Sequence, residues 1–205
     1  MLKRKLVIFG SNTAQEVHEA AMLSHNEEYM NIARQFFDEK SFEGDGSRIE
    51  SDCDAVDFHV GIADLEWKQR VVEACRRRGW TARSIVHPNA IVAPSASIGV
   101  GSFIGPLAVI SSNATIGEHC IIHIHCSIGH DASIGNFCAV LPGARISGKV
   151  QVGHGTIIGS NAFVFQGISI GVDCQVDALS YVGRDLAENH LVSPRSNGPV
   201  RRIRT

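Results

Sequence analysis

Residues 128–146 read IGHDASIGNFCAVLPGARI, and they show the pattern that decides the fold. An isoleucine or valine recurs at every sixth position, at Ile128, Ile134, Val140 and Ile146. The step continues in both directions without a break, so that seventeen positions from Val86 to Val182 are all Val or Ile. Internal repetition of this kind is typical of a solenoid, in which each repeat packs on the next.

The other positions of the hexad fit a solenoid with flat faces. The residue after the repeated Ile or Val is glycine nine times, for example at Gly99, Gly117 and Gly135. Glycine allows a positive φ and a close approach of backbones at a corner. Four residues after the repeated position, most side chains are small enough to fit inside beside a corner: Ala108, Ala114, Cys120, Cys126 and Ala132. An α-helix cannot use a strict period of six, so we predict a parallel β-helix.

Charged residues are unevenly distributed along the 205 residues of the chain. Of 19 basic and 21 acidic residues, only six lie between Val86 and Gly183. This change in composition predicts a small α/β domain over residues 1–83, the β-helix over 84–185 and a C-terminal tail over 186–205.

Charge and hydropathy also bear on the cellular compartment and on the kinds of partner that the protein can bind. A formal net charge of −2 gives no general attraction to nucleic acid or to anionic membranes. The apolar run near the N-terminus is too short for a signal peptide or a spanning helix. We therefore expect a cytoplasmic protein that binds neither nucleic acid nor membrane.

The first 83 residues alternate strand and helix patterns. A predicted strand over 5–9 is followed by the turn Gly10-Ser11-Asn12 and a helix over 15–23, and a strand over 56–62 precedes a helix over 65–78 capped by Asp64. This order predicts a Rossmann-like α/β unit. A strand-to-helix turn can bind phosphate, but this turn lacks the second and third glycine and acidic residues follow it. Nucleotide binding and a purely structural role are both open.

Histidines are concentrated in the predicted coil. Six of the ten lie there, and four fall within residues 119–130. A zinc site is not expected, because His123 and His125 occupy different hexad positions and no carboxylate or thiolate completes a set. His130 occupies the third hexad position, which should face outward near a corner, and an imidazole there can accept a proton near neutral pH. Asp131 would orient His130 if the chain bends between the two residues.

These residues resemble the NeuD/PglD-type sugar O- and N-acyltransferase family, and the resemblance covers nearly the whole chain. It rests on residues 5–10, 37–39, 87–90, 129–137 and 142–144. The segment 197–203 also looks like a lengthened form of the C-terminal ending of the family. The resemblance implies a left-handed β-helix with three hexads per coil, and a homotrimer. It also implies acetyl-CoA bound along the β-helix between subunits, and a sugar acceptor that is often UDP-linked with a free amine.

The same resemblance assigns roles to residues. His130 matches the catalytic histidine of the family and Asp131 its acidic neighbour. With three hexads per coil, residues eighteen apart stack, so Gly148 should lie above His130 and leave room and an N–H for the thioester. We assign the acetyl-CoA side to Gly148, Gly167, Arg201 and Arg202. We assign the acceptor side to Gly10, Asn12, Asp38 and His123.

Three positions depart from the family pattern and bear on the acceptor. Ala14 and Ala139 replace expected histidines, and His123 replaces an expected asparagine. We predict transfer of an acetyl group from acetyl-CoA to the amino group of an amino sugar. We expect this sugar to be nucleotide-linked and the reaction to need no metal. The alternatives are O-acetylation of a sugar hydroxyl, which the same base would serve, a non-catalytic β-helix binding scaffold and a β-helical carbonic anhydrase.

Overall fold

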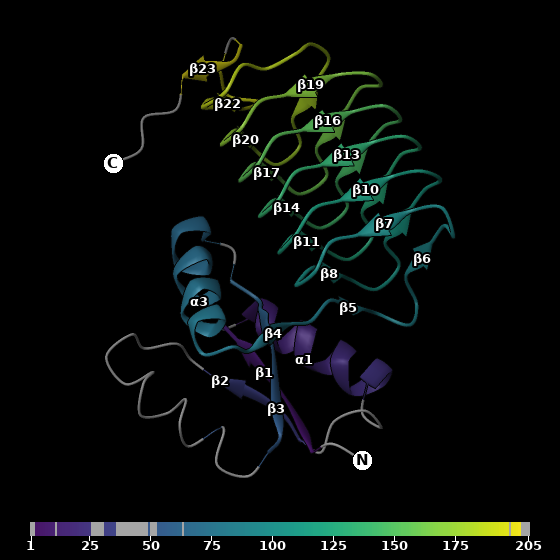
Figure 1. Ribbon diagram of the computed structural model, residues 1–205. Helices are drawn as coiled ribbons and strands as arrows, with labels where there is room; N and C mark the ends of the chain where they lie inside the picture. The colour runs from purple at the N-terminus through teal and green to yellow at the C-terminus, as the bar shows by residue number, and fades with distance from the viewer. Residues whose placement is uncertain are drawn as a thin grey trace. The chain divides into compact units, whose positions relative to one another are not determined.

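The computed structural model describes residues 3–10, 12–25, 31–35, 49, 53–62, 64–196 and 198–201. The chain divides into two compact units, Met1–Pro88 and Asn89–Thr205 (Figure 1). The first is an α/β unit with parallel strands and the second is a parallel β-helix. The fold class predicted from the hexads and from the strand and helix patterns is therefore confirmed.

The N-terminal unit is built on a parallel sheet with the strand order β2-β1-β3-β4. Its elements follow the predicted alternation: β1 Arg4–Phe9, α1 Asn12–His25, β2 Asn31–Gln35, β3 Ala55–Val60, α3 Leu65–Arg77, β4 Thr81–Ala82 and, at its end, β5 Ile85–Val86. Each helix follows a strand and leads towards the next parallel strand, as in a Rossmann-like unit. The predicted cap is also present, because the Asp64 carboxylate accepts the Trp67 N–H at 2.8 Å.

The core of this unit contains the central strands. Leu6, Val7, Ile8 and Phe9 of β1 are buried, and Phe9 stacks on Trp80 with 6.4 Å between ring centroids. A continuous apolar strand is typical of a sheet that is covered on both faces.

The second unit repeats short strands at a period of six. Its strands are β6 Ile91–Val92, β7 Ser97–Ile98, β8 Phe103–Ile104, β9 Val109–Ile110, β10 Thr115–Ile116, β11 Ile121–Ile122, β12 Ser127–Ile128, β13 Ser133–Ile134, β14 Ala139–Val140, β15 Arg145–Ile146, β16 Gln151–Val152, β17 Ile157–Ile158, β18 Phe163–Val164, β19 Ser169–Ile170, β20 Gln175–Val176, β21 Tyr181–Val182, β22 His190–Val192 and β23 Val200–Arg201.

The strands form three faces of a left-handed coil (Figure 1). We call the sheet β6-β9-β12-β15-β18-β21 the first face, β7-β10-β13-β16-β19 the second face, and β8-β11-β14-β17-β20-β22 the third face. From β6 to β21, each strand pairs in parallel with the strand eighteen residues away, as Ser127 does with Arg145. Pairing continues past residue 185 but changes there, because β22 pairs in parallel with β20 with Leu191 opposite Gln175, and β23 pairs antiparallel with β22.

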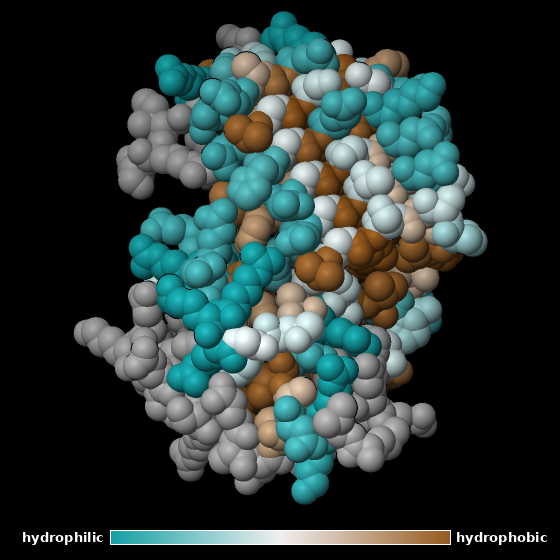
Figure 2. All heavy atoms as spheres, in the orientation of Figure 1, coloured by the Kyte–Doolittle hydropathy of each residue, from teal (hydrophilic) through white to brown (hydrophobic). Residues whose placement is uncertain are grey.

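The interior of the coil is filled as the hexads predicted. The repeated residues Ile110, Ile128 and Ile146 are each about 1% exposed, and the small position is equally buried at Cys120 and Cys138. Figure 2 shows brown and near-white residues in rows along the coil, in keeping with its few charges. Within the described residues, no helix is both long and apolar enough to cross a membrane.

The structure corrects one prediction about the corners. The glycine directly after the repeated residue does not supply the positive φ, which occurs two residues later, as at Asn113, Asp131 and Lys149. Glycine is needed at the earlier position because the next coil is too close: a Cβ on Gly99 would lie 2.5 Å from the carbonyl carbon of Gly117. Asn and Asp tolerate the left-handed conformation better than most residues.

Candidate active site

His130 and Asp131 lie at the corner between the first and second faces, after β12 and before β13. The parallel register stacks equivalent residues of successive coils here. We call Ser112, His130 and Gly148 the His130 column. We call Asn113, Asp131, Lys149 and Gly167 the Asp131 column.

The two predicted catalytic residues are in direct contact. Nδ1 of His130 lies 2.8 Å from Oδ2 of Asp131. Adjacent side chains diverge in an extended chain, but Asp131 has a φ of 59°, which bends the backbone between them. An ionised carboxylate only accepts hydrogen bonds, so Nδ1 of the neutral imidazole holds the hydrogen and Nε2 has a free lone pair. About half of each side chain is exposed, which leaves the pair accessible to a substrate.

Asp131 has a polar neighbour on each side within its own column. Asn113 donates a hydrogen bond from Nδ2 to Oδ1 of Asp131 at 3.1 Å. Lys149, one coil away on the other side, contributes positive charge. The hydrogen bonds from His130 and then Asn113 hold the pKa of Asp131 below its ordinary value, and the charge of Lys149, with that of His130 when it is protonated, acts in the same direction. Asp131 is therefore ionised at neutral pH.

Gly148 borders the free side of the imidazole. A Cβ at this position would lie 2.5 Å from Nε2 of His130 and 2.8 Å from Cδ2 and Cε1, so a side chain would collide with the ring. The Gly148 N–H has no acceptor in the part of the chain that the structure describes. Nε2 thus lies beside the backbone of Gly148, a buried residue that presents no side chain to the ring.

Two other residues that we predicted to contact acetyl-CoA lie on the coil. Gly167 contacts Gly148, because its N–H donates to the Gly148 carbonyl at 3.0 Å. A side chain on Gly167 would meet no atom within 4 Å. Arg201 is exposed on β23, the last strand. Arg202 lies outside the described residues.

Of the four predicted acceptor-side residues, only His123 belongs to the coil. Gly10 directly follows β1 and has a φ of 129°, and a Cβ there would lie 2.6 Å from the Gly61 oxygen, so packing within its own unit requires glycine. Asn12 begins α1, but its side chain is not described, and Asp38 lies outside the described residues. His123 is buried at a different corner, after β11 of the third face, so a strand of the first face separates it from His130.

Solved structures of other proteins resemble this chain over both of its units. The acetyltransferase domain of PglB from Neisseria gonorrhoeae FA1090 superposes with a TM-score of 0.83 at 23% identity, covering 97% of this chain and 100% of that one. WeeI from Acinetobacter baumannii AYE gives 0.84 at 19% identity with the same coverage. PerB from Caulobacter crescentus, solved in complex with CoA and GDP-perosamine, gives 0.79 at 25% identity and covers 91% of this chain and 92% of that one. A scan of family models and a search of curated sequences find no match.

The chain has the fold of the hexapeptide-repeat sugar N-acetyltransferases. The resemblance predicted from residues 129–137 and from the N-terminal unit is therefore confirmed for the fold. The neighbours contain both units, so the α/β unit is part of the shared architecture and not an unrelated addition.

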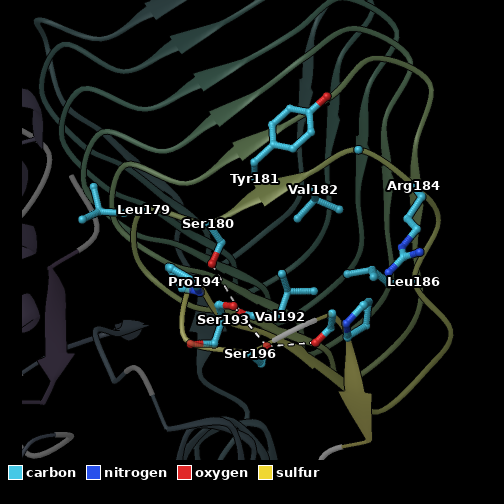
Figure 3. A pocket seen from close by; sticks show the side chains of 13 residues that line it. Leu179, Ser180, Tyr181, Val182, Arg184, Leu186, Val192, Ser193, Pro194 and Ser196 are labelled. Atoms are coloured by element: carbon cyan, nitrogen blue, oxygen red, sulfur yellow. Dashed lines mark hydrogen bonds between the residues drawn. The ribbon is translucent and has the colours of Figure 1, made fainter.

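A pocket of about 360 Å³ lies at the C-terminal end of this β-helix (Figure 3). Leu179, Val182, Leu186 and Val192 line it with apolar surface, and Tyr181, Arg184 and Ser193 are also among its lining residues. The Ser196 hydroxyl, which also lines the pocket, lies 2.8 Å from the Gly198 carbonyl and 3.1 Å from the Ser193 carbonyl and can donate its one hydrogen to either. Arg184 is stacked three coils beyond His130, so a cation stands at this end of the coil.

The histidines of the coil do not form a metal site with their neighbours in the described residues. In the described part of the chain, no three His, Cys, Asp or Glu side chains lie close enough together to hold a metal ion. His119 instead stacks on Phe137, with 5.1 Å between ring centroids. The histidine-rich segment is therefore distributed over several corners of the coil.

Proposed function

We propose that this protein transfers the acetyl group of acetyl-CoA to the amino group of an amino sugar, with His130 as general base. The observation that supports this most directly is the environment of His130, whose Nδ1 is held by Asp131 while Nε2 lies beside Gly148. A base oriented by a third group and exposed on its reactive side has the arrangement that acyl transfer requires.

The neighbours that match both units support this reaction class. The PglB domain is described as an acetyltransferase and was solved with acetyl coenzyme A. PerB was solved with CoA and GDP-perosamine, and it is described as a perosamine N-acetyltransferase. These ligands favour a nucleotide-linked amino sugar as acceptor and acetyl-CoA as donor for this chain.

The proposed step uses two groups of the His130 corner. Nε2 of His130 accepts the proton that the acceptor amine loses as its nitrogen bonds to the thioester carbonyl carbon. The Gly148 N–H donates to the carbonyl oxygen while negative charge develops on it. The C–S bond then breaks, and the proton on His130 passes to the departing CoA sulfur, so the products are an N-acetyl sugar and CoA.

Several exposed apolar residues on the first face support the proposal of a homotrimer. Ile91, Val109, Phe163 and Tyr181 point outward from β6, β9, β18 and β21, and Phe163 stacks on Tyr181. An apolar surface of this kind favours association. Light scattering should give three times the 22.1 kDa chain mass; a monomer at micromolar concentration would refute the trimer.

The function is tested by incubating the purified protein with acetyl-CoA and a panel of nucleotide-linked amino sugars. We expect CoA release together with an acetylated product that resists mild alkaline hydrolysis, as an amide does. An alkali-labile product would instead establish O-acetylation of a hydroxyl. If acetyl-CoA gives no increase in melting temperature, the chain does not bind it, and the scaffold alternative is favoured.

A further inference from the structure

We propose that Asn113 is a positioning residue, which fixes the Asp131 carboxylate and through it the His130 imidazole. The inference rests on the proposed function, because the base that is positioned is the one proposed there. Asn113, Asp131 and His130 then form a chain of side-chain hydrogen bonds that runs from one coil to the next and ends at Nε2, beside Gly148.

The geometry of the Asp131 column brings these groups together. Asn113 and Asp131 occupy the same corner of successive coils, eighteen residues apart, and their φ values are 58° and 59°. Because both residues have the same left-handed backbone, their side chains leave the coil in the same direction. The Asn113 N–H in turn donates to Oγ of Ser95, one coil further away, at 3.1 Å.

The two hydrogen bonds use different oxygens of one carboxylate. His130 Nδ1 lies at Oδ2 and Asn113 Nδ2 lies at Oδ1. A carboxylate with one contact can rotate about its Cβ–Cγ bond, whereas contacts at both oxygens fix its plane. Fixing that plane keeps Oδ2 aimed at Nδ1, which favours the tautomer whose Nε2 can accept a proton.

Lys149 does not replace this function. It lies on the opposite side of Asp131 in the same column, but it acts on Asp131 through charge and not through a hydrogen bond. Charge at this exposed site is screened by salt and does not fix the orientation of the carboxylate. Asn113 is therefore the group whose removal should change the direction in which Oδ2 points.

The test compares variants that keep the left-handed backbone. Asn113→Gly removes the amide at a φ that glycine adopts without strain. Asn161→Gly is the matched control, because Asn161 has a φ of 54° at another corner and its amide packs over Gly143. Asp131→Gly and the double variant with Asn113→Gly complete a cycle that separates action through Asp131 from independent action.

Activity is measured first. We expect Asn113→Gly to lower kcat by about tenfold, as for loss of one hydrogen bond to a charged group, with KM for acetyl-CoA unchanged. Asn161→Gly should keep the wild-type kcat. In the Asp131→Gly background the Asn113→Gly change should have no further effect. A wild-type kcat in Asn113→Gly, or an equal fall in both backgrounds, would overturn the proposal.

A second readout does not require the acceptor to be known. Nitrogen-15 NMR of selectively labelled histidine, at about pH 8.5 where an ordinary imidazole is neutral, reports which ring nitrogen of His130 holds the hydrogen. We expect the Nδ1–H tautomer in the wild type and a shift towards Nε2–H in Asn113→Gly. Unchanged tautomer populations would refute the positioning function. A shift of tautomer in a protein without acetyltransferase activity would refute the proposed reaction and leave the positioning function supported.

Discussion

Nδ1 of His130 lies 2.8 Å from Oδ2 of Asp131, although the two residues are adjacent in sequence. The contact depends on the φ of 59° at Asp131, which turns its side chain back along the corner towards His130. One residue thus serves as the corner of the coil and as the partner of the base. Because Asp tolerates this conformation and carries a carboxylate, it meets both requirements at once.

Removing the proposed base gives the most direct mechanistic prediction. His130→Ala should lower kcat by at least about 100-fold, since loss of a general base costs about 10²–10⁴-fold in rate. Binding of acetyl-CoA, followed by thermal shift, and the oligomeric state should be retained, because about half of the His130 side chain is exposed. His125→Ala, a change of an exposed histidine at another corner, should leave kcat near wild type. A near wild-type rate in His130→Ala would make the proposed mechanism wrong.

The bare backbone beside the imidazole gives a second prediction. A Cβ on Gly148 would lie 2.5 Å from Nε2, so Gly148→Ala forces the ring to move or closes the space beside it. We expect kcat to fall by at least about tenfold and KM for acetyl-CoA to rise, because small displacements of a catalytic group are costly. Ser112→Ala, one coil away on the opposite side of His130, is the control and should change neither. Full activity in Gly148→Ala would mean that the backbone at Gly148 does not face the reacting thioester.

Much of this corner followed from the sequence because the hexad period fixes position. The seventeen repeated Val and Ile residues predicted the coil, and the three hexads per coil that the family resemblance implied gave the step of eighteen that placed Gly148 beside His130. The same step of eighteen, applied to Asp131, leads to Asn113 and Lys149. The information was present, but the polar residues of the Asp131 column have no motif of their own.

Other features could not be read from the period. The position of the left-handed residue depends on how the backbone turns at each corner, and glycine content pointed to the wrong place because glycine is also selected by crowding, as at Gly99. Gly10 and Asp38 belong to the N-terminal part of the chain, where no repeat relates a residue to the coil. Their proposed contact with the acceptor remains a prediction.

The C-terminal arginines give a third prediction, for the donor. Arg201 is exposed on β23, and a guanidinium suits the phosphates of CoA. Arg201→Glu combined with Arg202→Glu should raise KM for acetyl-CoA by about tenfold or more, with KM for the acceptor unchanged. The control reverses Arg76 and Arg77 in α3, which changes net charge equally. A rise confined to the acceptor KM, or the same rise in the control, would contradict donor binding by these arginines.

The last prediction concerns the stability of the N-terminal unit at acid pH. His59 on β3 is fully buried, and its Nδ1–H donates to the Arg83 carbonyl at 3.0 Å. Burial lowers the pKa of His59 to about 4, the hydrogen bond to Arg83 opposes this, and the charge of Lys68 adds a smaller decrease. In the unfolded chain an ordinary imidazole has a pKa of about 6.5. Below that pH the unfolded state therefore binds a proton that the folded state excludes.

The sign follows from this difference in proton binding. Stability is unaffected above about pH 6.5 and decreases as the pH falls from there towards 4, by about 1.4 kcal/mol per pH unit. His59→Gln cannot titrate, so its free energy of unfolding should decrease by roughly 2 kcal/mol less than that of the wild type between about pH 7 and about pH 5. Tryptophan fluorescence in urea reports this unit, because both tryptophans of the chain, Trp67 and Trp80, belong to it. His125→Gln, at an exposed histidine of the coil, should keep the wild-type pH dependence. The same decrease in wild type and His59→Gln would show that His59 is not the group whose protonation the folded unit excludes.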